Sequence, residues 1–309
     1  MTASSPAITW LIPVKNAMPY LPETLESIRC QTYSNHEVLV WDNGSTDGTL
    51  EELQRWIPDR IPGRIVTGRP LSVGNSRAEL VRMANTELCA CVDGDDINLP
   101  HRLEKEVAFM LARPEVAAVG SQVIRIDETG AEHGQFCNLP REYDDIVHRL
   151  LHTWVMWQPA VMFRRSAVIE AGNYRDLRHE DYDLWLRLAT RYKLANMGEC
   201  LLKYRVHKNN LTYAIPAPEA ERDVNRAYIE AAPTLFGCTP EEADMLRNKR
   251  LSFAAPVLWR IARHLSQKNG GTFRDRLVSR SFLEAAGQAV RRRDFATRLL
   301  ISALRVSVR

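Results

Sequence analysis

The sequence contains no apolar run long enough to cross a membrane, since a transmembrane helix needs about 18 to 20 consecutive apolar residues. Its first residues, MTASSPAITWLIPV, place no basic residue ahead of the apolar stretch, so no secretory leader is expected. Both absences argue against an integral membrane protein or a secreted one. We therefore expect a cytoplasmic globular protein, and 309 residues allow one large domain or two smaller ones.

Cysteine is also scarce, with six residues scattered along the chain. Only Cys89 and Cys91 are close in sequence, and their C-x-C lies in an apolar run typical of a buried strand. Zinc sites and disulfide frameworks usually show regularly spaced cysteines, which this chain does not offer. We interpret the cysteines as reduced core residues.

Both glycine-rich loops that cradle phosphates, G-x-G-x-x-G and G-x-x-x-x-G-K-[ST], are missing. A bound diphosphate would then need a metal ion and basic side chains to neutralise it. Arg77, Arg205 and His207 are candidates, and the alternative for each is a solvated surface charge. Two metal patterns are excluded, because Gly44 breaks the EF-hand loop and Asp183 replaces the second His of H-E-x-x-H.

Acidic residues are rare near the C-terminus. The segment 247–309 has 15 Lys and Arg but only three acidic residues, whereas the whole chain carries a net charge of +3. Within it, 291–309 has the spacing of a basic amphipathic helix. Such a helix suits either peripheral contact with the inner face of a membrane or packing on the protein with its arginines solvated.

Short apolar runs alternate with helical patterns through the first 130 residues. This alternation predicts an α/β domain with a mostly parallel sheet, and in such sheets ligands bind beyond the carboxyl ends of the strands. The predicted strands are 8–14, 36–42, 63–68, 87–93 and 116–127, and the predicted helices are 20–31, 46–57, 74–85 and 99–114.

The alternation breaks down after residue 130. An irregular strand and a helix opened by Ser166 are expected in 152–174, followed by a helix at 179–192 and a strand at 199–207. The proline-containing stretch 213–223 has few apolar residues, so we expect a catalytic domain over 1–213 and a basic helical region over 214–309.

Two acidic clusters follow predicted strands, at 42–47 and 93–96, and should face the same crevice. Carboxylates such as those of Asp93 and Asp95 are hard ligands that suit Mg²⁺ or Mn²⁺. The alternative for this D-x-D is an acidic surface turn that also caps the next helix. Asp42 ends an apolar strand, where it could accept a hydrogen bond from a nucleobase, although a capped turn explains the same residues.

A third acidic cluster opens the predicted helix at 179–192, with Glu180, Asp181 and Asp183 in its first turn. One explanation is electrostatic, because acidic side chains complement the positive end of the helix dipole. The other is chemical, because a carboxylate at the rim of a crevice serves as a general base.

The motifs, taken in order, resemble those of the family 2 glycosyltransferases, which have the GT-A fold. They span roughly 7–213, about two-thirds of the chain, and they are IPVKN, SIRCQTY, VWDNGSTDGT, NSRAEL, VDGDDINLPHRL, HEDYDLWLRL and YRVH. The resemblance implies an inverting enzyme that moves a sugar from a nucleotide-diphospho-sugar, with UDP-sugars as first candidates. It implies a saccharide or lipid-linked acceptor in polysaccharide or glycolipid synthesis, and Mn²⁺ or Mg²⁺ as cofactor.

The resemblance also assigns roles to individual residues. It implies that Asp181 is the catalytic base and that Asp95 binds the metal ion that holds the diphosphate. The remaining implied donor-binding residues are Pro13, Asn16, Asp42, Arg77, Asp93, Arg205 and His207. The chain departs from the family pattern at Asn43 and Ala78, where Asp and Asn are usual, whereas Gly94 fits a position that needs a small side chain.

Two other functions compete with this interpretation. A nucleotidyltransferase would carry a glycine-rich loop after its first strand, where this chain has IPVKNAMPY. A non-catalytic module that binds sugar nucleotides or a partner protein would have no need of all these acids. Nucleic-acid binding is expected nowhere, because the basic tail lacks interleaved aromatic residues. An acceptor pocket is expected within 130–175, where Trp154 and Trp157 are either stacking platforms or core.

Overall fold

The computed structural model describes residues 5–136, 138–150, 153–210, 217–247 and 264. These residues form two compact units, the first from 1–149 with 154–220 and the second from 150–153 with 221–309. The expected boundary at 213–214 stays a prediction. The amphipathic helix expected at 291–309 lies outside the described residues, so its contact with a membrane stays a prediction too.

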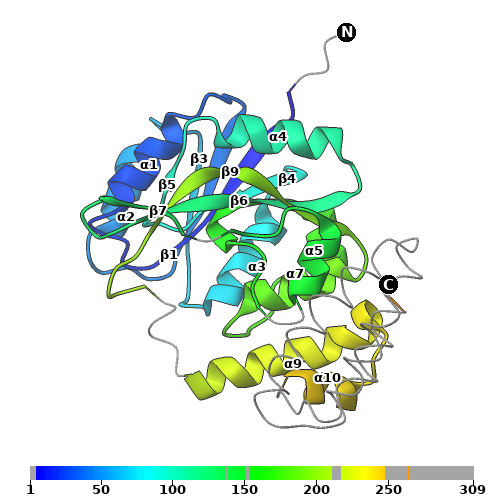
Figure 1. Cartoon of the computed structure of the whole chain (residues 1–309). Helices are drawn as coiled ribbons and strands as arrows, with labels where there is room; N and C mark the ends of the chain where they lie inside the picture. Colours follow the sequence, from blue (N-terminus) through cyan, green and yellow to red (C-terminus); the bar gives the residue numbers. More distant parts are fainter. Residues whose placement is uncertain (1–4, 137, 151–152, 211–216, 248–263, 265–309) are drawn as a thin grey trace. The chain divides into compact units, whose positions relative to one another are not determined.

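The first unit is built on a mixed sheet whose strands run in the order β3-β2-β1-β4-β8-β6-β9-β5, with β7 paired to β6 (Figure 1). Strands β3, β2, β1 and β4 are parallel, as are β6 and β9, and the other pairs are antiparallel. The strands are β1 (Ile8–Val14), β2 (His36–Asp42), β3 (Gly63–Thr67), β4 (Leu88–Cys91), β5 (Ile97–Asn98), β6 (Val116–Ile126), β7 (Glu132–Gln135), β8 (Val161–Arg164) and β9 (Lys193–Arg205).

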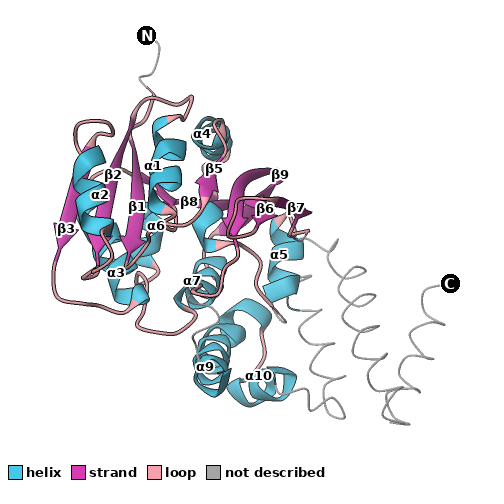
Figure 2. Cartoon of the chain, turned by 90° about the vertical axis from the view of Figure 1, so that its left-hand side faces the viewer, coloured by secondary structure: helices cyan, strands magenta, loops and turns pink. Residues whose placement is uncertain are grey.

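Helices lie on both faces of this sheet, with α4 on one side of β6 and β9 and with α5 and α7 on the other (Figures 1 and 2). Strand β1 lies inside the sheet between β2 and β4 and is buried along nearly its whole length, which explains its continuous apolar sequence. The helices are α1 (Leu21–Arg29), α2 (Thr49–Trp56), α3 (Val73–Met83), α4 (Arg102–Ala112), α5 (Tyr143–Leu150), the 3-10 turn η1 (Gln158–Ala160), α6 (Arg165–Glu170) and α7 (Glu180–Ala189).

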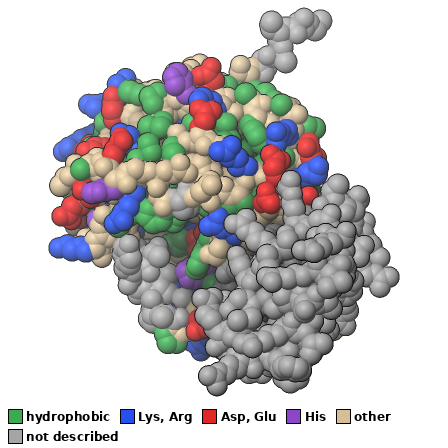
Figure 3. All heavy atoms as spheres, viewed as in Figure 1, with side chains coloured by type: hydrophobic (Ala, Val, Ile, Leu, Met, Phe, Trp, Pro, Cys, Tyr) green, Lys and Arg blue, Asp and Glu red, His purple; other side chains and the backbone are tan. Residues whose placement is uncertain are grey.

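The second unit contains most of α9 (Ala217–Phe236) and α10 (Pro240–Arg247). Helix α9 buries one stripe, because Val224, Ala227, Tyr228, Ala231 and Leu235 recur with helical spacing and are all buried. Among the described helices, none is both long and apolar enough to cross a membrane. Acidic, basic and hydrophobic side chains are interspersed over the face drawn in Figure 3.

Several local predictions are wrong. Helix α2 begins after Gly48, whose φ of 93° suits glycine, and it is the carboxylate of Asp47 that accepts the hydrogen bond of the Thr49 N–H. Helix α4 begins at Arg102, three residues later than predicted, and α6 begins at Arg165 without a side-chain cap, so Ser166 does not open it. Cys30 is exposed, whereas Cys89, Cys91 and Cys238 are buried, and none of the described cysteines is joined in a disulfide.

Candidate active site

The carboxyl ends of β1, β2 and β4 form one edge of the sheet. Val14 pairs with Asp42 and Leu11 pairs with Cys91, so the loops that follow the three strands emerge side by side. The two acidic clusters at 42–47 and 93–96 therefore lie on either side of the loop after β1. The sequence placed them at a common edge because parallel strands end together.

Asn16 joins the loop after β1 to the turn after β2. Its N–H donates to Ser45 Oγ at 2.9 Å, and its Oδ1 accepts the N–H of Thr46 at 2.8 Å. Its φ of 54° lies in the left-handed region, which asparagine tolerates better than most residues. Asp47 strengthens the same junction by accepting the N–H of Met18 at 2.9 Å. This predicted donor-binding residue therefore shapes the edge itself.

Asp42 is buried beside this junction, and its carboxylate oxygens both lie 3.4 Å from the Ser45 N–H. Pro13, on the neighbouring strand, is half-buried. Asn43 makes a reciprocal pair with Leu71, donating to its carbonyl at 2.7 Å and accepting its N–H at 2.6 Å. An ionised aspartate could only accept, so the structure gives the unusual Asn43 a physical reason.

The acidic loop 93–96 gives each carboxylate different partners. Asp93 Oδ1 accepts from Arg77 Nη2 at 2.8 Å, and Asp95 Oδ2 lies 2.9 Å from His207 Nε2. Asp96 is fully buried, and its Oδ1 accepts the N–H of Arg205 at 2.9 Å. Burial and then repulsion from the other carboxylates raise the pKa of both Asp95 and Asp96.

The three acids in the first turn of α7 also have different partners. Glu180 accepts from Arg77 Nε at 3.1 Å, and burial raises its pKa to about 7. Asp183 is buried against Arg187, which contacts it through Nε at 2.9 Å. Asp181 is half-buried, its Oδ1 accepts the N–H of Tyr182, and burial raises its pKa.

Arg77 connects the acidic loop with α7. Its side chain is only 8% exposed, and it bonds Asp93 through Nη2 and Glu180 through Nε. Burial acts to lower the pKa of this guanidinium, but the two carboxylates outweigh it and raise the pKa. The arginine thus brings the D-x-D loop beside the helix that carries Asp181.

Arg205 and His207 also contact the acidic loop, but in different ways. The buried Arg205 guanidinium donates to the carbonyl of Asp95 at 2.8 Å, lies over the ring of Tyr20 and pairs with Glu23. His207 is 9% exposed in its side chain and reaches the carboxylate of Asp95 directly.

Sequence reasoning missed several partners of these residues. Asn210 donates to Asp95 Oδ2 at 3.3 Å, and Arg205 contacts Glu23 on α1 and Tyr20 just before that helix. It also missed Arg102, a fully buried arginine behind the acidic loop. The sequence offered one signal for Asn210, because this residue lies close to His207 in YRVHKNN. It offered no signal for Arg102, because a single arginine in a helix is not distinctive.

Comparison with known proteins identifies the family. The sequence profile described as Glycosyl transferase family 2 matches residues 9–172, more than half of the chain. The chain belongs to glycosyltransferase family 2. AmsE of Erwinia amylovora, an amylovoran biosynthesis glycosyltransferase, is 35% identical over 193 residues, which are 60% of this glycosyltransferase and 70% of AmsE. This membership argues against the nucleotidyltransferase considered above.

Solved structures similar to this glycosyltransferase share its fold. TarS of S. aureus in complex with UDP-GlcNAc has a TM-score of 0.62 at 18% identity, covering 85% of this chain and 74% of TarS. The mannosyltransferase PcManGT of Pyrobaculum calidifontis, in complex with GDP-Man and Mn2+, has a TM-score of 0.59 at 19% identity, covering 98% of this chain and 87% of PcManGT. The predicted GT-A fold is thereby confirmed.

Proposed function

We propose that this glycosyltransferase moves a sugar from a nucleotide-diphospho-sugar to an acceptor hydroxyl with inversion at the anomeric carbon. A UDP-sugar is the first donor to test. The observation that carries the proposal is the Arg77 bridge, because it holds the D-x-D loop at Asp93 next to the helix of Asp181. Donor-binding acids and a candidate base then share one site.

A divalent metal ion fits the residues at Asp95. Its carboxylate side chain is 22% exposed and lies at the edge of the sheet, and oxygen is the ligand that Mg²⁺ and Mn²⁺ prefer. Among the described residues, no group of three or more His, Cys, Asp or Glu side chains could hold a metal ion alone. Mg²⁺ commonly takes one or two protein carboxylates and completes its shell with phosphate oxygens and water. The cation bound with the donor would supply Lewis-acid stabilisation of the leaving nucleoside diphosphate.

In the proposal, the donor-binding residues line the edge formed by the carboxyl ends of β1, β2 and β4. Asp42 accepts a hydrogen bond from the nucleobase, and Pro13 and Asn16 shape the strand end beside it. Asp93 faces the ribose, while His207 approaches the diphosphate from the segment after β9. Arg77 and Arg205 act from buried positions, where they hold carboxylates and carbonyls of the site.

Asp181 is the proposed general base. It takes the proton of the acceptor hydroxyl as that oxygen attacks the anomeric carbon on the face opposite the leaving group. A single displacement of this kind inverts the configuration. Among the described contacts, the carboxylate accepts one hydrogen bond, from the N–H of Tyr182, so much of its accepting capacity is left for the acceptor.

The acceptor is proposed to be a saccharide, free or lipid-linked, in the synthesis of a cell-surface polysaccharide or glycolipid. The similarity to AmsE supports this class, because AmsE is a glycosyltransferase of amylovoran biosynthesis. Trp154 supports it as well, since its indole is 40% exposed and its ring lies 5.1 Å from that of His179, two residues before Asp181. Aromatic faces of this kind suit the apolar face of a sugar ring.

A donor-hydrolysis screen tests the proposal. The protein is incubated with UDP-, GDP- and dTDP-sugars in the presence of Mn²⁺, and release of the nucleoside diphosphate is measured. We expect one nucleotide class to be cleaved and the cleavage to stop when EDTA is added. Asp95→Asn should weaken Mn²⁺-dependent donor binding by at least about 10-fold. Loss of a residue that only supports a metal ligand already has an effect of about this size, and Asp95 is the proposed ligand itself.

Glu79→Gln is the matched control, because Glu79 is an exposed acid on α3 whose partner is Arg82 on the surface. It should leave cleavage unchanged. Failure of the wild-type protein to bind or cleave every donor would contradict the proposal.

A further inference from the structure

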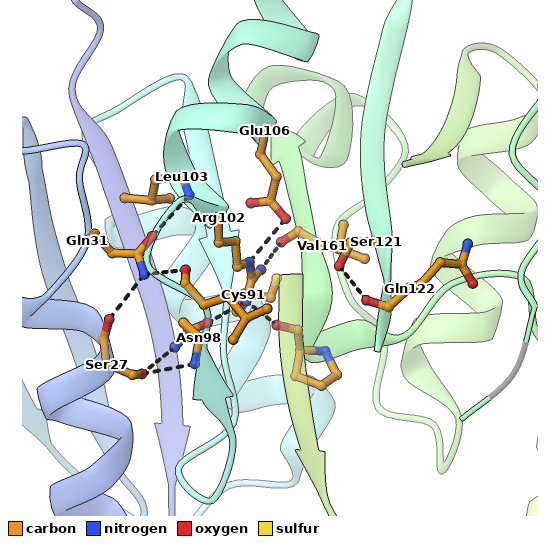
Figure 4. Close-up of polar contacts among 12 residues, drawn as sticks. Ser27, Gln31, Cys91, Asn98, Arg102, Leu103, Glu106, Ser121, Gln122 and Val161 are labelled. Atoms are coloured by element: carbon orange, nitrogen blue, oxygen red, sulfur yellow. Dashed lines mark hydrogen bonds and ion pairs between the residues drawn. The ribbon is translucent and has the colours of Figure 1, made fainter. Parts of the chain in front are cut away.

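Arg102 lies at the centre of a buried polar network that includes Cys91 and Asn98, which lie on either side of the acidic loop in sequence (Figure 4). Its side chain is completely buried, and its guanidinium lies over the ring of Trp10 on the central strand. Five acceptors surround the group, which is also the number of N–H donors that a guanidinium carries. They are Glu106 Oε1, Asn98 Oδ1 and the carbonyls of Cys91, Pro159 and Val161.

Two of these acceptors bracket the acidic loop. Nη2 donates to the carbonyl of Cys91 at 2.9 Å, two residues before Asp93. Nη1 donates to Asn98 Oδ1 at 2.7 Å, two residues after Asp96. One rigid, planar group therefore fixes the distance between the two ends of the loop.

Neighbouring side chains extend the same support to α1. Ser27 Oγ accepts both the N–H and the Nδ2–H of Asn98 at 3.0 Å. Gln31 donates to the carbonyl of Leu99 at 2.9 Å and accepts the N–H of Leu103 at 3.0 Å. The segment after the loop is thus held by α1 on one side and by Arg102 on the other.

The direction of the Arg102 bonds matters for the carboxylates. The guanidinium approaches the loop through a carbonyl and an amide oxygen, and its one ion pair is with Glu106. Among its described hydrogen bonds, the guanidinium therefore occupies no carboxylate oxygen of Asp93 or Asp95. Positive charge in a buried position offsets the repulsion among the acids while the carboxylates keep their capacity to bind a cation.

We propose that Arg102 is a positioning residue of the metal- and donor-binding site, which sets the geometry of Asp93 and Asp95 by clamping both ends of their loop. This inference rests on the proposed function. A purely architectural Arg102 would stabilise the fold without affecting how tightly the folded protein binds Mn²⁺ with a nucleoside diphosphate.

The variant Arg102→Met/Glu106→Leu separates these two roles. The double variant removes both members of the buried ion pair, so neither charge is left unpaired and the fold should persist. Arg102→Met alone would leave the buried Glu106 without its partner. Arg102→Lys is the milder second variant, because an ammonium keeps the charge but offers three donors in place of the fork. Circular dichroism and a thermal melt establish that each variant is folded.

Mn²⁺ affinity is the decisive measurement. Each protein is titrated with Mn²⁺ in the presence of UDP, GDP or dTDP, and free Mn²⁺ is followed by its EPR signal. We expect the double variant to lose about 10- to 100-fold in affinity, as loss of an outer-shell partner typically does, and Arg102→Lys to lose less. Glu106→Gln should stay close to the wild type, because the loop contacts of Arg102 remain.

Arg164→Met is the matched control for a lost arginine. Arg164 also donates to backbone carbonyls, those of Val116 and Met110, but it does not touch the acidic loop. It should lower the melting temperature without changing Mn²⁺ affinity. Folded Arg102 variants with wild-type Mn²⁺ affinity would overturn the inference about Arg102 but not the proposed function. A wild-type protein that binds Mn²⁺ with none of the three nucleotides would overturn the proposed function and this inference with it.

Discussion

The acidic loop 93–96 and the first turn of α7 both bring like charges close together, and both give each acid a different partner. Each places three carboxylates within four positions. In each, one acid pairs with Arg77, namely Asp93 and Glu180, and one is buried in a structural contact, namely Asp96 and Asp183. The third acid, Asp95 in the loop and Asp181 in the helix, is the one to which the proposed function gives a chemical role.

The two remaining acids differ in their partners. Asp95 is contacted by His207 and Asn210, both from the segment after β9, which orients its carboxylate as a ligand requires. Asp181 has one described hydrogen bond, to a backbone N–H next to it. Its carboxylate therefore keeps accepting capacity that an acceptor hydroxyl could use. The same composition thus produces a candidate ligand site and a candidate base.

Asp181→Asn should produce the largest change, because an amide cannot take a proton from the acceptor. We expect transfer to fall by about 10²- to 10⁴-fold, the usual contribution of a general base. Donor and Mn²⁺ binding should change by less than about twofold, since the substitution removes an interaction of the transition state. Single-turnover kinetics and a donor titration measure the two quantities. Near wild-type turnover would show that the base lies elsewhere.

Arg77→Met should break the link between the two acidic clusters. It leaves Asp93 and the buried Glu180 without their shared cation, and removing one partner from a buried pair costs about 3–5 kcal/mol. Urea unfolding followed by fluorescence measures the free energy of unfolding. Arg82→Met on the same helix is the control, because its pair with Glu79 is exposed and contributes little. Equal stability of the two variants would mean that the bridge is not what holds the clusters together.

The pH profile should show the smallest effect. Burial raises the pKa of Asp181 above its ordinary value of 3.8, and a base works only when deprotonated. The acidic limb of kcat/KM should therefore lie above the ordinary pKa of an aspartate, with activity rising as pH increases through the raised pKa. His179 acts to lower the pKa of Asp181, so His179→Gln should move this limb upward. A downward movement would contradict this assignment.

Local patterns predicted the first half of the sheet well. Strands β1 to β4 appear within a few residues of the expected ranges, because continuous apolar runs bounded by polar turns leave few other structures. The position of both acidic clusters at one edge followed from the parallel arrangement alone. These features depend on neighbours in sequence or on a general property of α/β sheets.

The partners of the site residues could not be predicted from the sequence. Strand β5 has two residues and exists because it pairs with β9, about 100 residues later. The bond between Arg205 and Asp95 spans 110 residues, and that between Arg77 and Glu180 spans 103. No local pattern encodes such contacts, and an arginine that bonds backbone carbonyls, such as Arg102, can have any residue types as partners.

These long spans have a consequence for how the protein acquires its activity. Closing loops of this length costs entropy before any bond forms, so contacts between distant residues tend to form late in folding. On a chain emerging from the ribosome, Asp93 and Asp95 appear before Glu180, Arg205 and His207 exist. The acidic loop is therefore completed only when β9 adds to the sheet, and a partly made chain should be unable to retain the proposed donor.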